Sequence, residues 1–141
     1  MSCYHSAVIN ASIDEVWSVV SNFHEINYAP EVISSVTSVG GTSGTKAGAK
    51  RILNDAFHET LLSIDQSSYL FSYSIDDGPG VVSKDAVSNY VGTVKLHPIT
   101  VGGDTCIEWA SDYESEDPEA VADFCNPIYN ALLVSLKNHF A

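Results

Sequence analysis

Apolar and polar residues alternate along much of this chain, and such alternation is typical of β-strands that bury one face. Clusters of Gly, Asn, Asp and Pro separate the alternating runs. The separations from residue 49 onward are short, which indicates an antiparallel meander, because antiparallel neighbours need only a tight turn between them. The predicted strands are residues 4–10, 32–39, 49–53, 57–64, 69–75, 87–97 and 105–113.

A helical spacing of apolar residues follows the first predicted strand. Ser12 and Glu15 match the S-x-x-E capping box, which predicts the start of a helix. A second short helix is expected over residues 24–28, ended by Pro30. The apolar stripe of the first helix, at spacings i, i+3, i+4 and i+7, consists of Val16, Val19, Val20 and Phe23.

The chain ends in a long predicted helix. Asp117 suits its N-cap and Pro118 its first position. Pro127 lies inside the helical pattern and predicts a kink, because it removes one backbone donor. The apolar stripe consists of Val121, Phe124, Cys125, Ile128, Leu132, Leu136 and Phe140.

These elements predict an α+β fold in one domain of residues 1–141. We expect a curved, antiparallel seven-stranded sheet wrapped around the C-terminal helix, with two short helices after the first strand. One helix cannot easily close a wide sheet, so the gap predicts an internal cavity; a fully packed core is the alternative. The residues on the face turned toward that helix are Leu53, Leu61, Tyr69, Phe71, Tyr73, Ile75, Tyr90, Val94, Leu96, Ile107, Trp109 and Tyr113.

The charge of the chain excludes some partners. Its net charge is −12, and eight acidic residues lie between Asp104 and Asp123 without a Lys or Arg. Such a surface repels phosphate backbones and anionic headgroups, so we expect no nucleic-acid partner. The acidic run is either a solvated face or a protein-interaction module for a basic partner.

The spacing of cysteines and histidines and the hydropathy of the chain predict its compartment and argue against membrane insertion and metal binding. Cys3, Cys106 and Cys125 are widely spaced and odd in number, which fits a reducing, cytoplasmic setting better than a disulfide framework. No secretory signal and no apolar run of membrane-spanning length is visible, so we expect no membrane insertion. No histidine pair has ligand spacing, so we expect no metal and no cofactor, in a monomer or weak dimer.

Arg51 is the only arginine of the chain, and its predicted strand is followed by a tight hairpin. A three-residue turn at 54–56 would place Leu53 opposite Phe57 and Arg51 opposite Glu59. A two-residue turn would instead place His58 opposite Arg51. Face parity favours the first register, in which the guanidinium can pair with the carboxylate.

The order of elements and several local motifs resemble the SRPBCC superfamily of START and Bet v 1-like helix-grip domains, closest to its polyketide cyclase/dehydrase-like branch. The resemblance spans essentially the whole chain and implies the helix-grip fold and a hydrophobic, lipid-, polyketide- or isoprenoid-like ligand. This chain lacks the long gate loop that hormone receptors of the superfamily carry between the strands of the matching arginine and glutamate. The residues that carry it are Ile13-Asp14-Glu15-Val16-Trp17, Gly48-x-x-Arg51, Glu59-x-Leu61 with Asp65, Tyr73-Ser74-Ile75, Asn89-Tyr90, Pro98 and Glu108-Trp109.

The expected function is therefore binding of a small hydrophobic molecule between the sheet and the C-terminal helix. The alternative is a cyclase, dehydratase or isomerase in which, by resemblance, Arg51, Glu59 and Tyr90 are catalytic. A purely structural Arg51–Glu59 pair is a third interpretation. Residues 76–86 are the candidate lid. The expected ligand-binding residues are Arg51, Leu53, Glu59, Leu61, Phe71, Tyr73, Tyr90, Trp109, Phe124, Ile128 and Leu132.

Overall fold

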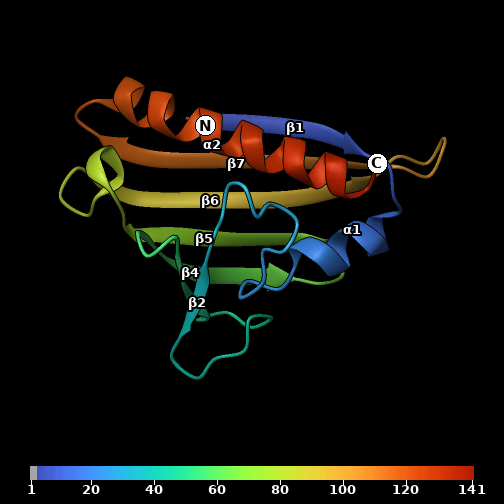
Figure 1. Ribbon diagram of the computed structural model, residues 1–141, viewed down its shortest axis with the longest axis horizontal. Helices are drawn as coiled ribbons and strands as arrows, with labels where there is room; N and C mark the ends of the chain where they lie inside the picture. The colour runs from blue at the N-terminus through green and yellow to red at the C-terminus, as the bar shows by residue number, and fades with distance from the viewer. Residues whose placement is uncertain (1–2) are drawn as a thin grey trace.

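The computed structural model describes residues 3–141 and contains one seven-stranded antiparallel sheet in the order β1-β7-β6-β5-β4-β3-β2. Consecutive strands from β2 to β7 are neighbours, as the short turns predict, and β1 closes the far edge beside β7 (Figure 1). The strands are β1 (Cys3–Ile9), β2 (Val36–Val39), β3 (Lys50–Leu53), β4 (Phe57–Asp65), β5 (Leu70–Asp77), β6 (Val87–Pro98) and β7 (Thr105–Ser115).

Two α-helices and one 3-10 turn complete the described elements: α1 (Ile13–Val20), η1 (Gly80–Val82) and α2 (Pro118–His139). The predicted caps are confirmed, since Ser12 Oγ accepts from Glu15 N at 3.3 Å and Asp117 Oδ1 accepts from Ala120 N at 3.1 Å. α2 continues through Pro127 without ending there.

The predicted second short helix is wrong, and the strand predicted over residues 32–39 is shorter than expected. Residues 21–35 form turns and irregular backbone. Two amides, those of Val32 and Ile33, bond to Ala29 O, and the next two bond to the side chain of Asn54. These local bonds use the donors that a strand ladder would need, so β2 begins only at Val36.

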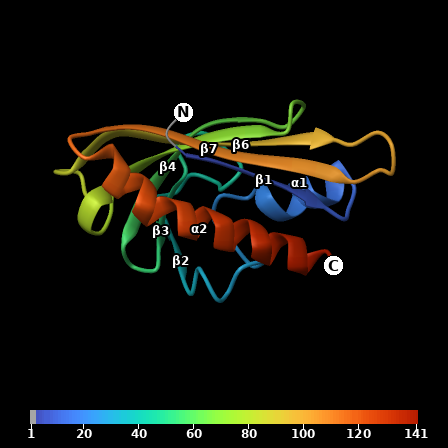
Figure 2. The ribbon, with the colours of Figure 1, turned by 90° about the horizontal axis from the view of Figure 1, so that it is seen from above.

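The inward face of the sheet carries the core. Figures 1 and 2 show α2 lying along one face, with the segment between α1 and β2 on the same side. The predicted face parity is confirmed for most positions: Tyr69, Ile75 and Tyr113 are partly buried, and the other nine are buried. The helix-grip fold class is confirmed.

No helix among residues 3–141 combines the length and the apolarity needed to cross a bilayer.

Candidate functional site

The Arg51–Glu59 pair is the one buried ion pair among the described residues. β3 and β4 pair with Leu53 opposite Phe57 and Arg51 opposite Glu59, which confirms the three-residue hairpin register. Asn54 and Asp55 adopt the left-handed backbone that this turn requires, with φ values of 54° and 56°. Each charged side chain is only 5% exposed, so a strand hairpin holds a salt bridge inside the fold.

Two nitrogens of the Arg51 guanidinium contact the same carboxylate oxygen of Glu59. Arg51 Nε donates to Glu59 Oε1 at 2.8 Å, and Arg51 Nη2 lies 2.7 Å from the same atom. Nη1 donates to Phe23 O at 3.0 Å, and the Phe23 ring lies 3.8 Å from Cζ. A cation–π contact therefore covers one face of the guanidinium while its edge is hydrogen-bonded.

Burial raises the pKa of Glu59 above its ordinary value, although the neighbouring Arg51 opposes this shift. No hydrogen bond from residues 3–141 reaches the second oxygen, Oε2. The carboxyl group is therefore half satisfied, with one oxygen committed to Arg51 and one open as an acceptor.

A small internal cavity adjoins this pair, between β3–β7 and α2. Its volume is about 40 Å³, room for roughly three water-sized groups. It is apolar apart from the ion pair and the tyrosine hydroxyls described below. The lining residues are Ile26, Ile33, Arg51, Leu53, Phe57, Glu59, Tyr73, Ile75, Tyr90, Trp109, Cys125, Ile128, Tyr129 and Leu132.

Eight of the eleven expected ligand-binding residues line this cavity, and Leu61, Phe71 and Phe124 lie outside its lining. Leu61 and Phe71 belong to the packed core, where Phe71 lies beside the Trp17 ring of α1. Phe124 stacks on Phe57 with ring centroids 6.2 Å apart. The structure thus combines a packed core with a small cavity beside the ion pair.

A chain of buried hydroxyl groups forms the opposite wall. Trp109 Nε1 donates to Tyr73 Oη at 2.9 Å, and Tyr73 Oη lies 3.4 Å from Tyr129 Oη. Tyr129 Oη bonds to Tyr90 Oη, which donates to Cys125 Sγ at 3.5 Å. In the two contacts between tyrosine hydroxyls, either oxygen can be the donor.

Burial keeps the three tyrosine hydroxyls and the Cys125 thiol protonated. Desolvation raises the pKa of Tyr73, Tyr90 and Tyr129 well above their ordinary value, and raises that of the Cys125 thiol to about 11. Tyr90 is therefore a neutral hydrogen-bonding group at neutral pH. Tyr129 was missed from the sequence, although it follows Cys125 by four positions on the helical stripe.

The absence of a side chain at Gly92 leaves room for the Tyr73 ring, whose hydroxyl belongs to the hydroxyl chain. The two residues lie directly opposite each other on β6 and β5. A Cβ on Gly92 would lie 2.3 Å from Tyr73 Cζ and 2.5 Å from its hydroxyl oxygen. Gly92 has no left-handed backbone conformation, so the space left by the absent side chain is its structural contribution.

The irregular segment between α1 and β2 closes the cavity on one side. Ile26 and Ile33 line the cavity, and the same two residues line an outer groove of about 310 Å³. Asn54 holds this segment to the β3–β4 turn: Oδ1 accepts from Ser34 N at 2.7 Å and Nδ2 donates to Val32 O at 3.0 Å. A hydrogen bond between Glu31 and Ser135 ties the segment to α2.

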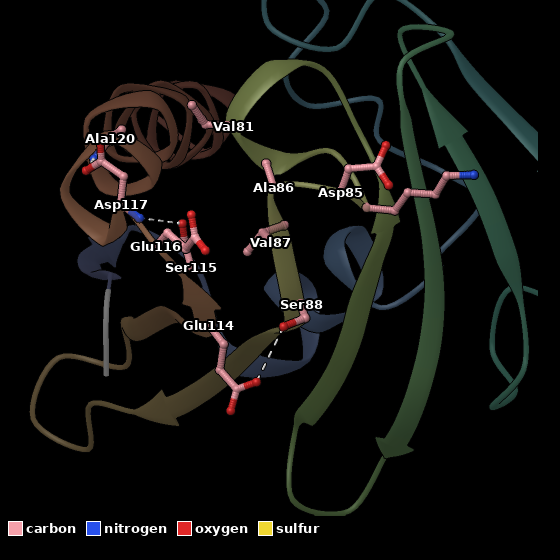
Figure 3. A pocket seen from close by; sticks show the side chains of 11 residues that line it. Val81, Asp85, Ala86, Val87, Ser88, Glu114, Ser115, Glu116, Asp117 and Ala120 are labelled. Atoms are coloured by element: carbon pink, nitrogen blue, oxygen red, sulfur yellow. Dashed lines mark hydrogen bonds between the residues drawn. The ribbon is translucent and has the colours of Figure 1, made fainter.

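A larger groove lies elsewhere, at the beginning of α2, and has a volume of about 630 Å³. Figure 3 shows Ala86 and Val87 between Asp85 on one side and the acidic side chains of Glu114, Glu116 and Asp117 on the other. Two of these acids have local roles: Glu114 accepts from Asn89 Nδ2 at 2.8 Å, and Asp117 caps α2. This groove is open, has both charged and apolar lining residues, and does not include the Arg51–Glu59 pair.

Within residues 3–141, no cluster of three or more His, Cys, Asp or Glu side chains is arranged to hold a metal ion. The candidate site is therefore described by its own side chains: one ion pair, one hydroxyl chain and an apolar wall.

Similar proteins share this architecture. A solved structure from Nitrosospira multiformis is 39% identical, with a TM-score of 0.95, covering 99% of this chain and 95% of that chain. Major latex-like protein 151 of Panax ginseng is 17% identical, with a TM-score of 0.76 and coverage of 99% and 96%. Norcoclaurine synthase of Thalictrum flavum, solved with dopamine and hydroxybenzaldehyde, is 16% identical, with a TM-score of 0.73 and coverage of 96% and 83%.

The comparison with curated proteins finds no match. The family model described as "Polyketide cyclase / dehydrase and lipid transport" matches residues 2–141. Together with the seven-stranded sheet around α2, this match supports a hydrophobic-ligand-binding fold. The chain belongs to the polyketide cyclase/dehydrase and lipid transport family.

Proposed function

We propose that this protein binds a small, mostly apolar molecule between the sheet and α2, and that Arg51 and Glu59 contact a polar oxygen group on it. The observation that carries this proposal is the half-satisfied ion pair beside an otherwise apolar cavity. Buried charges normally engage all their polar atoms. An open carboxylate oxygen next to apolar walls therefore supports contact with a ligand.

A purely structural role accounts for less of this geometry. A buried ion pair contributes little net stability compared with apolar side chains of similar volume. A structural pair is also expected to form two parallel bonds through both carboxylate oxygens. Here Arg51 reaches only Oε1 of Glu59.

Ligand binding requires the walls to move, because drug-sized ligands occupy pockets of roughly 300–1,000 Å³ and this cavity measures about 40 Å³. The side chains of Ile26 and Ile33 separate the cavity from a groove open to solvent. We propose that displacement of this segment, rather than of residues 76–86, admits the ligand. Val82 in the latter segment is 0% exposed and packs in the core.

The neutral fluorescent probe N-phenyl-1-naphthylamine tests the binding proposal. We expect saturable binding by the wild type and at least about tenfold weaker binding by Leu132→Trp, which fills the cavity. Leu62→Trp is the matched control, because Leu62 is 46% exposed on the other side of the sheet. Absence of saturable binding, or equal loss in both variants, would contradict the proposal.

Proton-transfer catalysis is a second candidate function, favoured by the raised pKa of Glu59 and its open Oε2. A carboxylate in an apolar site is a stronger base than one in water. The probe reaction is ring opening of 5-nitrobenzisoxazole, which begins with removal of one carbon-bound proton. Wild type should accelerate it above buffer and Glu59→Gln should not. A wild-type rate equal to that of buffer, or a Glu59→Gln variant that retains the rate, would remove this candidate.

The acidic groove carries less support as an interaction site, because local hydrogen bonds account for Glu114 and Asp117. We also propose a cytoplasmic, single-domain protein that acts as a monomer or weak dimer. The widely spaced cysteines and the net charge of −12 support this.

A further inference from the structure

The hydrogen-bonding inventory of the ion pair specifies the kind of polar group that fits it. A guanidinium has five N–H donors. Two of them donate hydrogen bonds here, Nε–H to Glu59 Oε1 and one Nη1–H to Phe23 O, and Nη2 makes an ion-pair contact with Oε1. Arg51 therefore keeps at least one N–H group on each of Nη1 and Nη2 for an acceptor on the ligand.

Glu59 supplies the hydrogen-bond acceptor that complements the donors of Arg51. Its Oε2 accepts no hydrogen bond from residues 3–141 and belongs to the same carboxylate that Arg51 holds. The site thus presents donors and an acceptor side by side on two paired residues. A ligand group that satisfies both must itself carry an acceptor next to a donor.

The hydroxyl groups already bond to one another. Tyr129 contacts both Tyr73 and Tyr90, and Tyr90 donates to the Cys125 thiol. Trp109 already donates to Tyr73. Arg51 is therefore the strongest remaining donor for a ligand carbonyl on the cavity wall.

Charge balance sets the ionisation state. Arg51 is the only cation and Glu59 the only carboxylate among the cavity-lining residues. The pair is neutral as a whole, so an added anion would place two negative charges against one guanidinium that is only 5% exposed. Burial of an unpaired charge is strongly unfavourable.

We infer that the ligand group recognised by Arg51 and Glu59 is neutral and pairs an acceptor with an adjacent donor, as a primary amide, a protonated carboxylic acid or a hydroxy ketone does. A carboxylate anion is disfavoured, although an arginine lines the cavity. This inference rests on the proposed binding function and specifies the ligand class of the same site.

Benzamide and benzoate test this inference, because they share one apolar ring and differ in the head group. At neutral pH benzamide is neutral with a carbonyl and an N–H, whereas benzoate is an anion with acceptors only. We expect displacement of N-phenyl-1-naphthylamine, and direct calorimetric titration, to show benzamide binding at least about tenfold more tightly. Equal affinities, or tighter binding of benzoate, would overturn the inference.

Glu59→Gln provides the decisive variant. Removing the carboxylate leaves Arg51 without a counter-charge, so the preference should invert in favour of benzoate. Glu15→Gln removes an exposed carboxylate and should leave the preference unchanged. An unchanged preference in Glu59→Gln would contradict the role assigned to this carboxylate.

A double variant covers the case in which Glu59→Gln does not fold. Arg51→Met with Glu59→Leu replaces the pair by apolar side chains of similar size, which commonly preserves folding. It should bind N-phenyl-1-naphthylamine while losing the benzamide preference. If the double variant retains that preference, the inference is wrong.

The wild type distinguishes failure of the inference from failure of the proposed function. If the wild type binds the fluorescent probe but not benzamide, the inference alone fails. If it binds neither compound, the proposed function fails as well.

Discussion

Gly92 shows how one residue without a side chain shapes the candidate site. Its missing Cβ allows the Tyr73 ring to lie against β6, where the Tyr73 hydroxyl accepts from Trp109. The same placement keeps the Tyr73 ring within 5.7 Å of the Arg51 guanidinium carbon. Ion pair and hydroxyl chain therefore meet through one tyrosine.

Gly92→Ala should lower the free energy of unfolding by about 1–3 kcal/mol, the usual range for overpacking a core. The added methyl group displaces the Tyr73 ring and breaks its bond with Trp109. Chemical denaturation measures the effect. Gly41→Ala is the control, because its Cβ would meet no atom within 4 Å, and it should change stability by less than about 0.5 kcal/mol. Equal effects in the two variants would refute this account of Gly92.

Glu59 should make stability fall as pH rises. Its pKa is raised above the ordinary value of 4.5, so the folded state holds the proton more tightly than the unfolded state. The resulting stabilisation is fully present below pH 4.5 and is lost as pH rises through the folded-state pKa. Relative to Glu59→Gln, the wild-type free energy of unfolding should decrease in this range by up to about 1.4 kcal/mol per pH unit. A flat or rising difference would contradict the sign.

At the scale of elements, the segment between α1 and β2 completes the cavity without forming regular structure. A second short helix ended by Pro30 was predicted there, but the backbone is irregular and Ile26 and Ile33 line the cavity. Hydrogen bonds from Asn54 and between Glu31 and Ser135 attach this segment to the β3–β4 turn and to α2. Such non-local contacts leave no periodic signal in the sequence.

Asn54→Gly tests this attachment. Glycine keeps the left-handed turn but removes the side-chain bonds to Ser34 and Val32. We expect a loss of about 1–3 kcal/mol and faster amide hydrogen exchange in residues 32–36. Asp55→Gly is the matched control, since Asp55 is exposed at φ 56° and its side chain makes no such bonds. Unchanged exchange in Asn54→Gly would exclude the attachment.

The long C-terminal helix is the element best predicted from its own sequence. Its cap, its first proline and most of its stripe are confirmed. The omission of Tyr129 has a physical reason: a tyrosine fits either an apolar or a polar surface. Only its contacts with Tyr73 and Tyr90, on the neighbouring strands β5 and β6, show that the Tyr129 hydroxyl is buried.

At the scale of the whole molecule, buried tyrosines set an upper pH limit for the fold. Burial raises the pKa of Tyr28 to about 12, and desolvation raises the pKa values of Tyr73, Tyr90 and Tyr129 well above their ordinary value. Because these groups keep their protons more tightly when folded, their contribution to stability is complete below pH 10 and decreases above it.

We therefore expect cooperative alkaline unfolding, in which tyrosinate absorbance from the buried tyrosines develops together with loss of near-ultraviolet circular dichroism. Each such tyrosine should contribute a slope of up to about 1.4 kcal/mol per pH unit. Ionisation of all the tyrosines near pH 10 with unchanged dichroism would contradict the burial of this hydroxyl chain.

The sequence by itself determined the antiparallel meander from β3 to β7, the inward face of the sheet, the caps of the helices and the register that places Arg51 opposite Glu59. These features follow from local periodicity and turn chemistry, which neighbouring residues encode. The tertiary structure alone decided the size of the cavity, the order of the hydroxyl chain and the irregular segment that closes one side. They depend on side chains from distant elements packing together, and no short stretch of sequence specifies which atoms will meet.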